Sequence, residues 1–329
     1  MKSWIIVGLA AIALSAVAQP GTGGQPGAQP PADQPKPVIP DMPKTSPPLP
    51  DPKKVVATVN GAQITAEEVA RMAFEWAAAE IIDEIILQRL VEEDAKKLGI
   101  AIDDAEIDKK YMASLENAAR NVPPNMTLPD FLKRNRFPAS RLYSRTRTQH
   151  LAEKAVERQL NLDEFVQYRQ IVFRIPGSTP EEQNNNAVEV EKKANEVHKM
   201  LTDGLDFGEA AKVHSEDQFS KDKGGLMDFQ PMQFLMPELQ EKLKSMKPGD
   251  FSAPYKSLQG YMIIKLEKLG SQATPAEMET IKQTGVRLKI GEYIQNLQST
   301  AKITNEIVKP PSTEAEGANT GVPSPRNRP

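Results

Sequence analysis

Cysteine is absent from the 329-residue chain, and several other residue types are scarce. Without cysteine the protein can form no disulfide, no thiolate zinc site, no iron–sulfur cluster and no cysteine nucleophile. Histidine occurs three times, and aromatic residues make up 5% of the chain. Neither sign of charge dominates, since 41 Lys+Arg stand against 44 Asp+Glu. Because nucleic-acid binding requires a basic surface that releases counterions, this balance argues against a nucleic-acid partner.

Long apolar runs are also missing, except for one run of 15 residues near the N-terminus that follows Lys2 and ends in Ala16-Val17-Ala18. A basic residue, an apolar stretch and small residues before a cleavage position make up an export signal. A membrane-spanning helix needs about 20 apolar residues, which is more than this run offers. We therefore expect a signal peptide over 1–18, cleavage after Ala18 and a periplasmic or extracellular protein; a retained anchor is the alternative. No cysteine follows the run, so a lipoprotein anchor is excluded.

Proline is concentrated outside the expected folded part. Twelve of the 28 prolines fall in residues 20–52, and five more fall in 309–329. Segments so rich in proline and polar residues do not bury a core. We predict a disordered linker over 19–53 and a disordered tail over 309–329, with the folded part between about residues 54 and 308. The linker is expected to act as an extended spacer, and a docking motif at PPLP, residues 47–50, is the alternative.

The first folded segment is expected to be helical. A β-branched run, VVATV, ends in Asn60-Gly61, a strong signal for a hairpin turn. Thr65 and Glu68 then form a capping box, which opens a helix that continues through LQRLVEEDAKKLGI. A second amphipathic helix, a short third one and a longer fourth one follow before residue 163.

Charge is segregated within this segment. Between Glu75 and Glu116 there are 12 acids and 5 bases, whereas residues 131–152 hold six bases and no acid. The six bases are Lys133, Arg134, Arg136, Arg141, Arg145 and Arg147. Because the two blocks nearly cancel, we expect the basic face to meet the acidic helices of its own domain. Recognition of nucleic acid or of an anionic membrane surface is the alternative.

The second folded segment mixes strands and helices. It opens with a β-branched and aromatic strand, QYRQIVFRI at 167–175, and a charged helix follows from Pro180 to about Leu201. Short motifs then follow in the order DFGEAA, SED, GGLMDF, MPEL, KPGD and GYMIIKL. A last helix is expected from Pro275 to about Ala301.

The order of these motifs resembles the parvulin-type (PpiC, rotamase) peptidyl-prolyl isomerase domain. In the first segment, VATVNGAQITAEEV, LQRLVEEDAKKLGI and DDAEID are similar to the N-terminal chaperone region of SurA-like and PrsA-like extracytoplasmic foldases. The resemblance implies an α+β protein: a SurA-N-like helical domain over 54–163, and a parvulin domain over 164–270 with about four antiparallel strands. It also implies that a helix at 275–304 returns to complete the helical domain; local packing on the parvulin domain is the alternative.

The resemblance assigns catalytic positions as well. Parvulins use two buried histidines on neighbouring strands, with an Asp or Cys beside them. Matched residue by residue, the histidine positions fall on Gln170 and Met262, and the acidic position falls on Asp217. Leu226 stands where the family motif has an Asp. Asp217 has a second interpretation, in which it only fixes the loop that follows it.

The proline pocket implied by the resemblance is apolar. Its family positions fall on Leu235 and Leu239, and we expect Phe229 and Met227 to complete the substrate-binding surface. Flexible methionine side chains around the cleft would adapt to varied partners, or else serve in ordinary core packing. These methionines are Met227, Met232, Met236 and Met262.

The departures at the two histidine positions decide the predicted function. Rotation about an X–Pro bond is slow because of a barrier of ~18–20 kcal/mol, and an isomerase must stabilise the twisted amide. Gln170 can form hydrogen bonds, but Met262 offers only a weakly accepting sulfur, so a His–His–Asp network cannot form. His214, directly before the SED triplet, is an alternative base.

We predict an exported chaperone that binds unfolded or proline-containing polypeptides, with isomerase activity weak or lost. A fully active isomerase that uses Asp217, and a non-catalytic scaffold in an envelope assembly, are the alternatives. No paired-histidine motif, Walker loop or G-x-G-x-x-G occurs, so no metal and no small-molecule cofactor are expected. The sequence leaves the oligomeric state open.

Overall fold

The computed structural model describes residues 37–308, so the predicted signal peptide, the first part of the predicted linker and the predicted tail lie outside the described residues. The chain divides into two compact units. The first unit holds the residues up to Ala155 together with those from Gly291 onward, and the second unit is Val156–Ile290. No helix in the described part of the chain is both long and apolar enough to cross a membrane.

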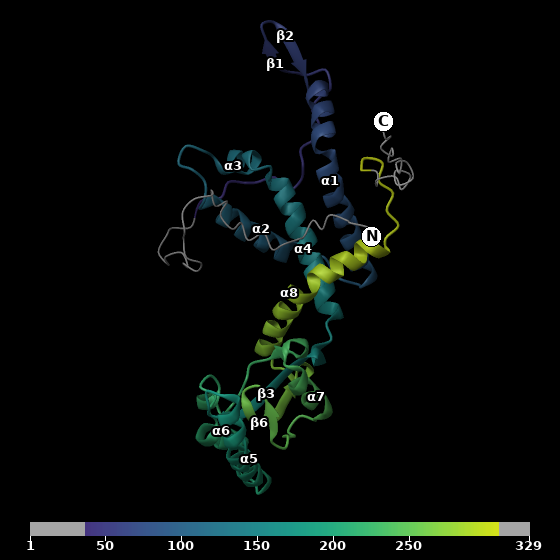
Figure 1. Cartoon of the computed structure of the whole chain (residues 1–329). Helices are drawn as coiled ribbons and strands as arrows, with labels where there is room; N and C mark the ends of the chain where they lie inside the picture. Colours follow the sequence, from purple (N-terminus) through teal and green to yellow (C-terminus); the bar gives the residue numbers. More distant parts are fainter. Residues whose placement is uncertain (1–36, 309–329) are drawn as a thin grey trace, which may run out of the picture. The chain divides into compact units, whose positions relative to one another are not determined.

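The first unit is helical apart from one hairpin. Its elements are β1 (Val55–Val59), β2 (Ala62–Thr65), α1 (Ala66–Lys97), α2 (Asp104–Ala119), α3 (Leu128–Arg134), most of α4 (Ala139–Gln159) and the end of α8 (Pro275–Thr300). The hairpin turns at Asn60-Gly61, as predicted, and lies at the N-terminal end of α1 (Figure 1). The predicted capping box is confirmed, because the Glu68 N–H donates to Thr65 Oγ1 at 3.3 Å and the Thr65 N–H donates to Glu68 Oε2 at 2.9 Å.

The core of the first unit lies among α2, α3 and α4. Its buried side chains are Met42, Tyr111, Leu115, Ala118, Leu128, Leu132, Ala139 and Leu142. Met42 belongs to the segment predicted as a disordered spacer, and Lys44 pairs with Asp108 at 2.7 Å. The prediction of a disordered spacer over 19–53 is therefore wrong for the residues around Met42 and Lys44. The apolar side chains of Ile39 and Met42 pack into the core of the first unit. The neighbouring prolines lower the conformational entropy that is lost when the segment is ordered.

The basic face of α4 meets acidic side chains of its own unit, as the sequence predicts. Arg141 Nη2 lies 2.5 Å from Glu84 and 2.9 Å from Glu80, both on α1. Arg145 pairs with Glu84 at 2.8 Å, and Arg147 extends the series to α1 and α2. Three of the six bases thus hold helices together rather than facing a partner.

The second unit is built around one small sheet. Its elements are the end of α4, η1 (Leu162–Glu164), β3 (Phe165–Phe173), α5 (Pro180–Thr202), α6 (Phe207–His214), η2 (Lys221–Lys223), β4 (Gln230–Pro231), η3 (Met232–Phe234), α7 (Pro237–Ser245), β5 (Tyr255–Ser257), β6 (Gly260–Leu269), η4 (Gly270–Gln272) and the first part of α8. The strand order is β4-β3-β6-β5, with every pair antiparallel. This arrangement confirms the predicted α+β architecture with about four antiparallel strands.

Alternate residues of β3 and β6 lie on opposite faces of the sheet and belong to two separate hydrophobic cores. One face of the sheet, with Ile171 and Ile263, packs against α5 and α6. The other face, with Val172 and Met262, packs against α7. Figure 1 shows β3 and β6 between these helices. Because side chains alternate across a strand, each residue of the central strands is committed to one face, and the α7 face is the one that carries the predicted site.

The last helix crosses from one unit to the other. The division falls inside α8, after Ile290. In the second unit, Gly285 comes so close to Leu160 that an added Cβ would lie 2.7 Å from the Leu160 side chain. In the first unit, the Tyr293 hydroxyl donates to Asp94 at 2.9 Å. The helix predicted over 275–304 ends at Thr300. Its residues up to Ile290 contact the second unit, and its residues from Gly291 onward contact the first unit.

Candidate functional site

Asp217 and Gln170 lie side by side, although 47 positions separate them in the chain. Gln170 Nε2 donates to Asp217 Oδ2 at 2.9 Å. Both side chains are buried, with 7% of Gln170 and 6% of Asp217 exposed. Gln170 stands on β3 with its side chain on the α7 face, whereas Asp217 lies in the loop after α6. The structure thus joins two of the three residues assigned from the resemblance.

Four donors keep the buried Asp217 carboxylate charged. Burial by itself would raise the pKa of Asp217, but hydrogen bonds from the Ser220 hydroxyl, Gln170 and the backbone N–H groups of Phe219 and Ser220 outweigh it, so the pKa lies below its ordinary value. Hydrogen bonds to the charged form have this effect in general. Asp217 is therefore an anion at neutral pH whose acceptor sites are largely taken.

The glycine pair after Asp217 brings the loop against β3. Gly225 has a φ of 75°, and a Cβ there would lie 2.3 Å from the Gln170 carbonyl oxygen. The Gln170 N–H donates to the Gly225 carbonyl at 2.9 Å. Arg169 fixes the other side of the loop, since its Nη1 donates to the carbonyls of Lys223 and Gly224. The GG motif is thus required by the close approach of two backbones.

Met262 lies on β6, on the same face of the sheet as Gln170. Gln170 is paired with Ile264 and Met262 with Val172, so the two residues are diagonal neighbours across adjacent strands. Only 5% of Met262 is exposed, and its sulfur lies 4.0 Å from the Tyr255 hydroxyl. The three assigned residues therefore converge on one region, but Met262 shares no hydrogen bond with Asp217 or Gln170.

The predicted pocket residues separate into two groups. Leu235 and Leu239, each 7% exposed, pack with Met262 in the core beneath α7, and Met227 packs against the same cluster. Phe229 is half-buried and is not part of that cluster. Leu235, Leu239 and Met227 thus share one apolar cluster with Tyr168 and Val172, which stand on either side of Gln170 on the same face of β3, whereas Phe229 lies outside that cluster.

Several residues of this region were missed by the sequence analysis. Ser220, 1% exposed, donates to Asp217, and Ser215, fully buried, accepts from the N–H groups of Val172 and Asp217. Tyr168, 4% exposed, stands two residues before Gln170 on the same face of β3. A serine three positions after an acidic residue is a local turn signal that could have revealed Ser220.

His214 does not replace the missing histidines. It is the last residue of α6, and within residues 37–308 it forms no hydrogen bond with Asp217 or Gln170. No group of three or more His, Asp or Glu side chains in the described part of the chain could hold a metal ion.

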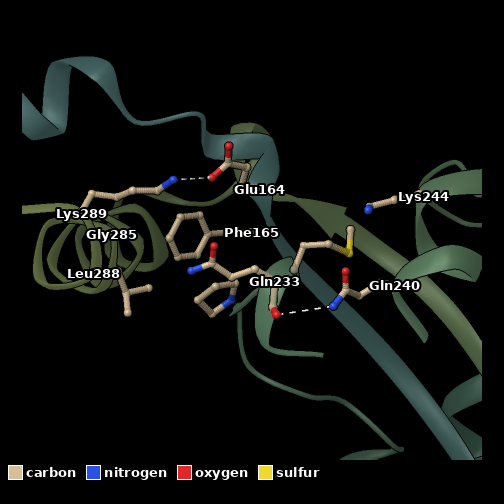
Figure 2. Close-up of a pocket in the computed structure, with 10 residues that line it drawn as sticks. Glu164, Phe165, Gln233, Gln240, Lys244, Gly285, Leu288 and Lys289 are labelled. Carbon is tan, nitrogen blue, oxygen red and sulfur yellow. Dashed lines mark hydrogen bonds and ion pairs between the residues drawn. The ribbon is translucent and has the colours of Figure 1, made fainter. Parts of the chain in front are cut away.

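A pocket of about 280 Å³ lies between the η1–β3 and β4–η3 segments, α7 and the first part of α8 (Figure 2). It is lined by Glu164, Phe165, Pro231, Met232, Gln233, Gln240, Lys244, Gly285, Leu288 and Lys289. An ion pair of 3.5 Å between Lys289 and Glu164 crosses one rim, and Gln240 Nε2 donates to the Gln233 carbonyl at 3.4 Å. None of the four predicted pocket residues lines it, although Met232, one of the methionines expected around the predicted cleft, does.

The part of α1 from Ala66 to Ile85 carries a second feature of interest, a set of exposed apolar side chains. The α1 apolar surface consists of Val69, Met72, Phe74, Trp76, Ile81 and Ile85, which are 43–73% exposed. The hairpin beside it adds exposed Val55, Val56 and Val59. At about 3.6 residues per turn, Val69, Met72 and Trp76 lie on one side of the helix, and Phe74, Ile81 and Ile85 lie on another. Groups of exposed apolar side chains commonly mark an interaction site.

Comparison with known families identifies the class of the second unit. Residues 171–268 match the family model described as rotamase, PPIC-type PPIase domain. The chain thus carries a PpiC-type, parvulin-like domain, which at the family level is a peptidyl-prolyl isomerase domain. Asp217, Met262 and the four pocket residues lie inside the matched range, and Gln170 lies one residue before it.

The relatives include foldases and chaperones. The chain is 27% identical over 187 residues to the foldase protein PrsA of Caldanaerobacter subterraneus, which covers 57% of this chain and 56% of that protein. It is 25% identical over 241 residues to the chaperone SurA of Nitrosococcus oceani, with 69% and 54% covered. A crystal structure of PrsA from Bacillus cereus aligns at 19% identity and a TM-score of 0.40, covering 78% of this chain and 96% of that one. The chain spans about half the length of the curated relatives it matches.

Proposed function

We propose that the protein is an exported foldase that binds unfolded polypeptides, and that its parvulin-like domain has weak or no isomerase activity. The observation that carries the chaperone part is the α1 apolar surface. Large apolar side chains are ordinarily buried, yet the first half of α1 exposes Phe74 by 65% and Trp76 by 73%. Unfolded polypeptides are rich in the apolar side chains that such a surface would bind.

Suppression of aggregation tests this part. Light scattering of a thermally unfolded model protein should fall when the full chain is added. Replacing Phe74, Trp76 and Ile81 together by serine should remove most of the effect. A matched control replaces three exposed apolar residues of α5 and α6 by serine, namely Val188, Met200 and Val213. Equal loss of protection in both triple variants, or no protection by the wild type, would refute the chaperone proposal.

The proposal of weak isomerase activity is supported by the chemistry at the two histidine positions. The side-chain amide of Gln170 already donates a hydrogen bond to Asp217. Met262 provides a thioether whose polar neighbour, the Tyr255 hydroxyl, is 4.0 Å away. Neither side chain can exchange a proton at neutral pH. The twisted amide of the substrate can then be stabilised only by desolvation in the apolar cleft and by fixed hydrogen bonds.

Proline isomerisation measured by two-dimensional exchange NMR on a short Phe-Pro peptide tests this proposal. The wild type should accelerate exchange weakly or not at all, and Gln170→His combined with Met262→His should raise the rate at least about tenfold, as expected for general catalysis by positioned side chains. A wild-type rate at the level of an ordinary active parvulin domain would show that the site is fully functional.

We infer export from the N-terminal sequence and from the chaperones and foldases among the relatives. Cell fractionation followed by N-terminal sequencing tests it. The expected mature protein is found outside the cytoplasm and begins at Gln19, after cleavage behind Ala18. A cytoplasmic protein that keeps Met1 would exclude this assignment.

A further inference from the structure

Tyr168 is a nearly buried side chain with an unused hydroxyl. Only 4% of the residue is exposed, and its ring packs in the cluster beneath α7. Its hydroxyl forms no hydrogen bond with any group in residues 37–308, yet it is not among the atoms sealed inside the protein. Buried hydroxyls nearly always have a partner, so a side chain placed in this way points to a ligand.

Tyr168 belongs to the region where the resemblance predicts the substrate cleft. Tyr168 and Gln170 are two residues apart on the same face of β3. Burial and the negative charge of Asp217 raise the pKa of Tyr168 to about 12. The hydroxyl therefore keeps its proton at neutral pH and is available as a donor.

Tyr255 supplies a second hydroxyl in the same cleft. It stands on β5 opposite Met262, and within residues 37–308 its hydroxyl has only the Met262 sulfur as a partner, at 4.0 Å. Burial, with the neighbouring Tyr168 and Glu238, raises its pKa above the ordinary value. The Lys242 ammonium lies 4.5 Å from the centre of its ring and holds the ring in place. Since sulfur is a weak acceptor, this hydroxyl can change partner at little cost.

The other polar groups of the cleft are already engaged. Asp217 only accepts, and it receives the Ser220 and Gln170 donors. A proline-containing segment presents backbone carbonyl oxygens but no N–H at proline. The complementary protein group is a donor beside an apolar wall, and Tyr168 beside Leu235 and Leu239 meets that requirement.

We propose that Tyr168 is the substrate-binding donor of the cleft, and that its hydroxyl donates to the carbonyl oxygen preceding proline in a bound polypeptide, with the Tyr255 hydroxyl as the second donor. The inference rests on the proposed function, because it names the group in the same cleft that recognises the polypeptide.

Binding of a dye-labelled, uncharged peptide with one central Phe-Pro bond to the full chain, followed by fluorescence anisotropy, tests this assignment. Tyr168→Phe should weaken binding about 3–10-fold, the effect of one net hydrogen bond, and Tyr255→Phe should weaken it less. Tyr261→Phe is the matched control, because that hydroxyl donates to Glu191 on the opposite face of the sheet. Thermal unfolding of each variant checks that the ring packing is intact.

A second peptide separates a direct hydrogen bond from a structural effect. Replacing the carbonyl oxygen before proline by sulfur weakens it as an acceptor, so Tyr168→Phe should then change the affinity less than twofold. If the wild type binds the Phe-Pro peptide and Tyr168→Phe binds it equally well, the inference is wrong while the proposed function stands. Equal weakening with both peptides also overturns it. A wild type that binds neither peptide would overturn the proposed function of this cleft together with the inference.

Discussion

A single buried carboxylate organises the candidate site at the scale of residues. Asp217 is 6% exposed and receives donors from β3, from Ser220 and from the loop backbone. Removing such an acceptor leaves several buried donors without a partner, which costs more than the net gain of making the bonds. Asp217 therefore has a structural role whether or not it acts on a substrate.

The first prediction concerns Asp217 and pH. Its folded-state pKa lies below the ordinary value, so it contributes stability that is present above about pH 4, the pKa of an unfolded aspartate. That contribution is lost as the pH falls through the lower, folded-state pKa.

Asp217→Asn should lower the free energy of unfolding by about 1–3 kcal/mol at pH 7, with a smaller difference near pH 2. Urea unfolding between pH 2 and pH 7 measures this, with exposed Asp222→Asn as control; a difference that is constant over the whole range would contradict it.

The second prediction compares two glycines. Gly260, at the start of β6, has a φ of 123°, and an added Cβ would lie 2.1 Å from the Phe173 carbonyl oxygen. Gly291, inside α8, has no atom within 4 Å of the position of an added Cβ. Gly260→Ala should destabilise the protein by more than about 1 kcal/mol, whereas Gly291→Ala should stabilise it by up to about 1 kcal/mol. Chemical denaturation monitored by circular dichroism gives both values, and the same sign of change in both variants would be evidence against this account.

At the scale of elements, the contact between α1 and α4 depends on arginine forks. Arg141 donates through Nε and Nη2 to the two oxygens of Glu84, and also reaches Glu80. Hydrogen bonds to these carboxylates raise the pKa of Arg141 above its ordinary value. A bidentate and partly buried pair of this kind is stronger than an exposed one.

A double-mutant cycle gives the third prediction. The coupling between Arg141→Met and Glu84→Gln should be about 1 kcal/mol at low salt and should decrease as salt is added. The exposed pair Lys193–Glu189, at 3.0 Å within α5, is the control and should couple by less than about 0.5 kcal/mol. Coupling energies that are equal for the two pairs would mean that the arginine fork contributes nothing beyond a surface ion pair.

At the scale of the whole molecule, burial is unevenly distributed along α1. Leu87, Val91 and Ala95 in its second half are buried, whereas most of its first half and all of β1 are exposed. A two-stranded hairpin is marginally stable by itself, so the start of the first unit depends on the rest of α1. The part of the chain with the least packing also carries the α1 apolar surface.

The fourth prediction is a gradient of hydrogen exchange along α1. Amides of residues 66–77 should exchange much faster than those of 87–95, because local opening costs least where few side chains are buried. Amides of β3 and β6, which carry fully buried Ile171 and Ile263, should be among the slowest. Mass spectrometry of the exchanging full chain measures this, and an added unfolded polypeptide should slow exchange at 66–77 more than at 87–95. Uniform protection along α1 would exclude the gradient.

Local signals in the sequence determined the elements. The capping box at Thr65, the helical spacing of apolar residues and the Asn60-Gly61 turn act within a few positions of one another, which is why they could be interpreted without the fold. The order of short motifs identified the parvulin-like domain, which the match over 171–268 supports. The same local reasoning misjudged Met42, because whether a lone apolar side chain among prolines enters a core depends on what lies opposite it.

The resemblance assigned Gln170, Asp217 and Met262 to one site, but only the tertiary structure decided which contacts these and other distant side chains make. Gln170 and Asp217 are 47 positions apart, and Arg141 and Glu84 are 57 positions apart, so no periodicity relates them. Tyr168 and Tyr255 appear in the sequence as ordinary strand residues, and only the pairing of β5 and β3 with β6 brings them to the same face of the sheet as Gln170 and Met262. The sequence by itself determined the fold class, and it determined which face of each helix or strand is charged and which is apolar. Packing decided which element each face contacts, because burial and hydrogen bonding depend on neighbours that the chain brings together only when it folds.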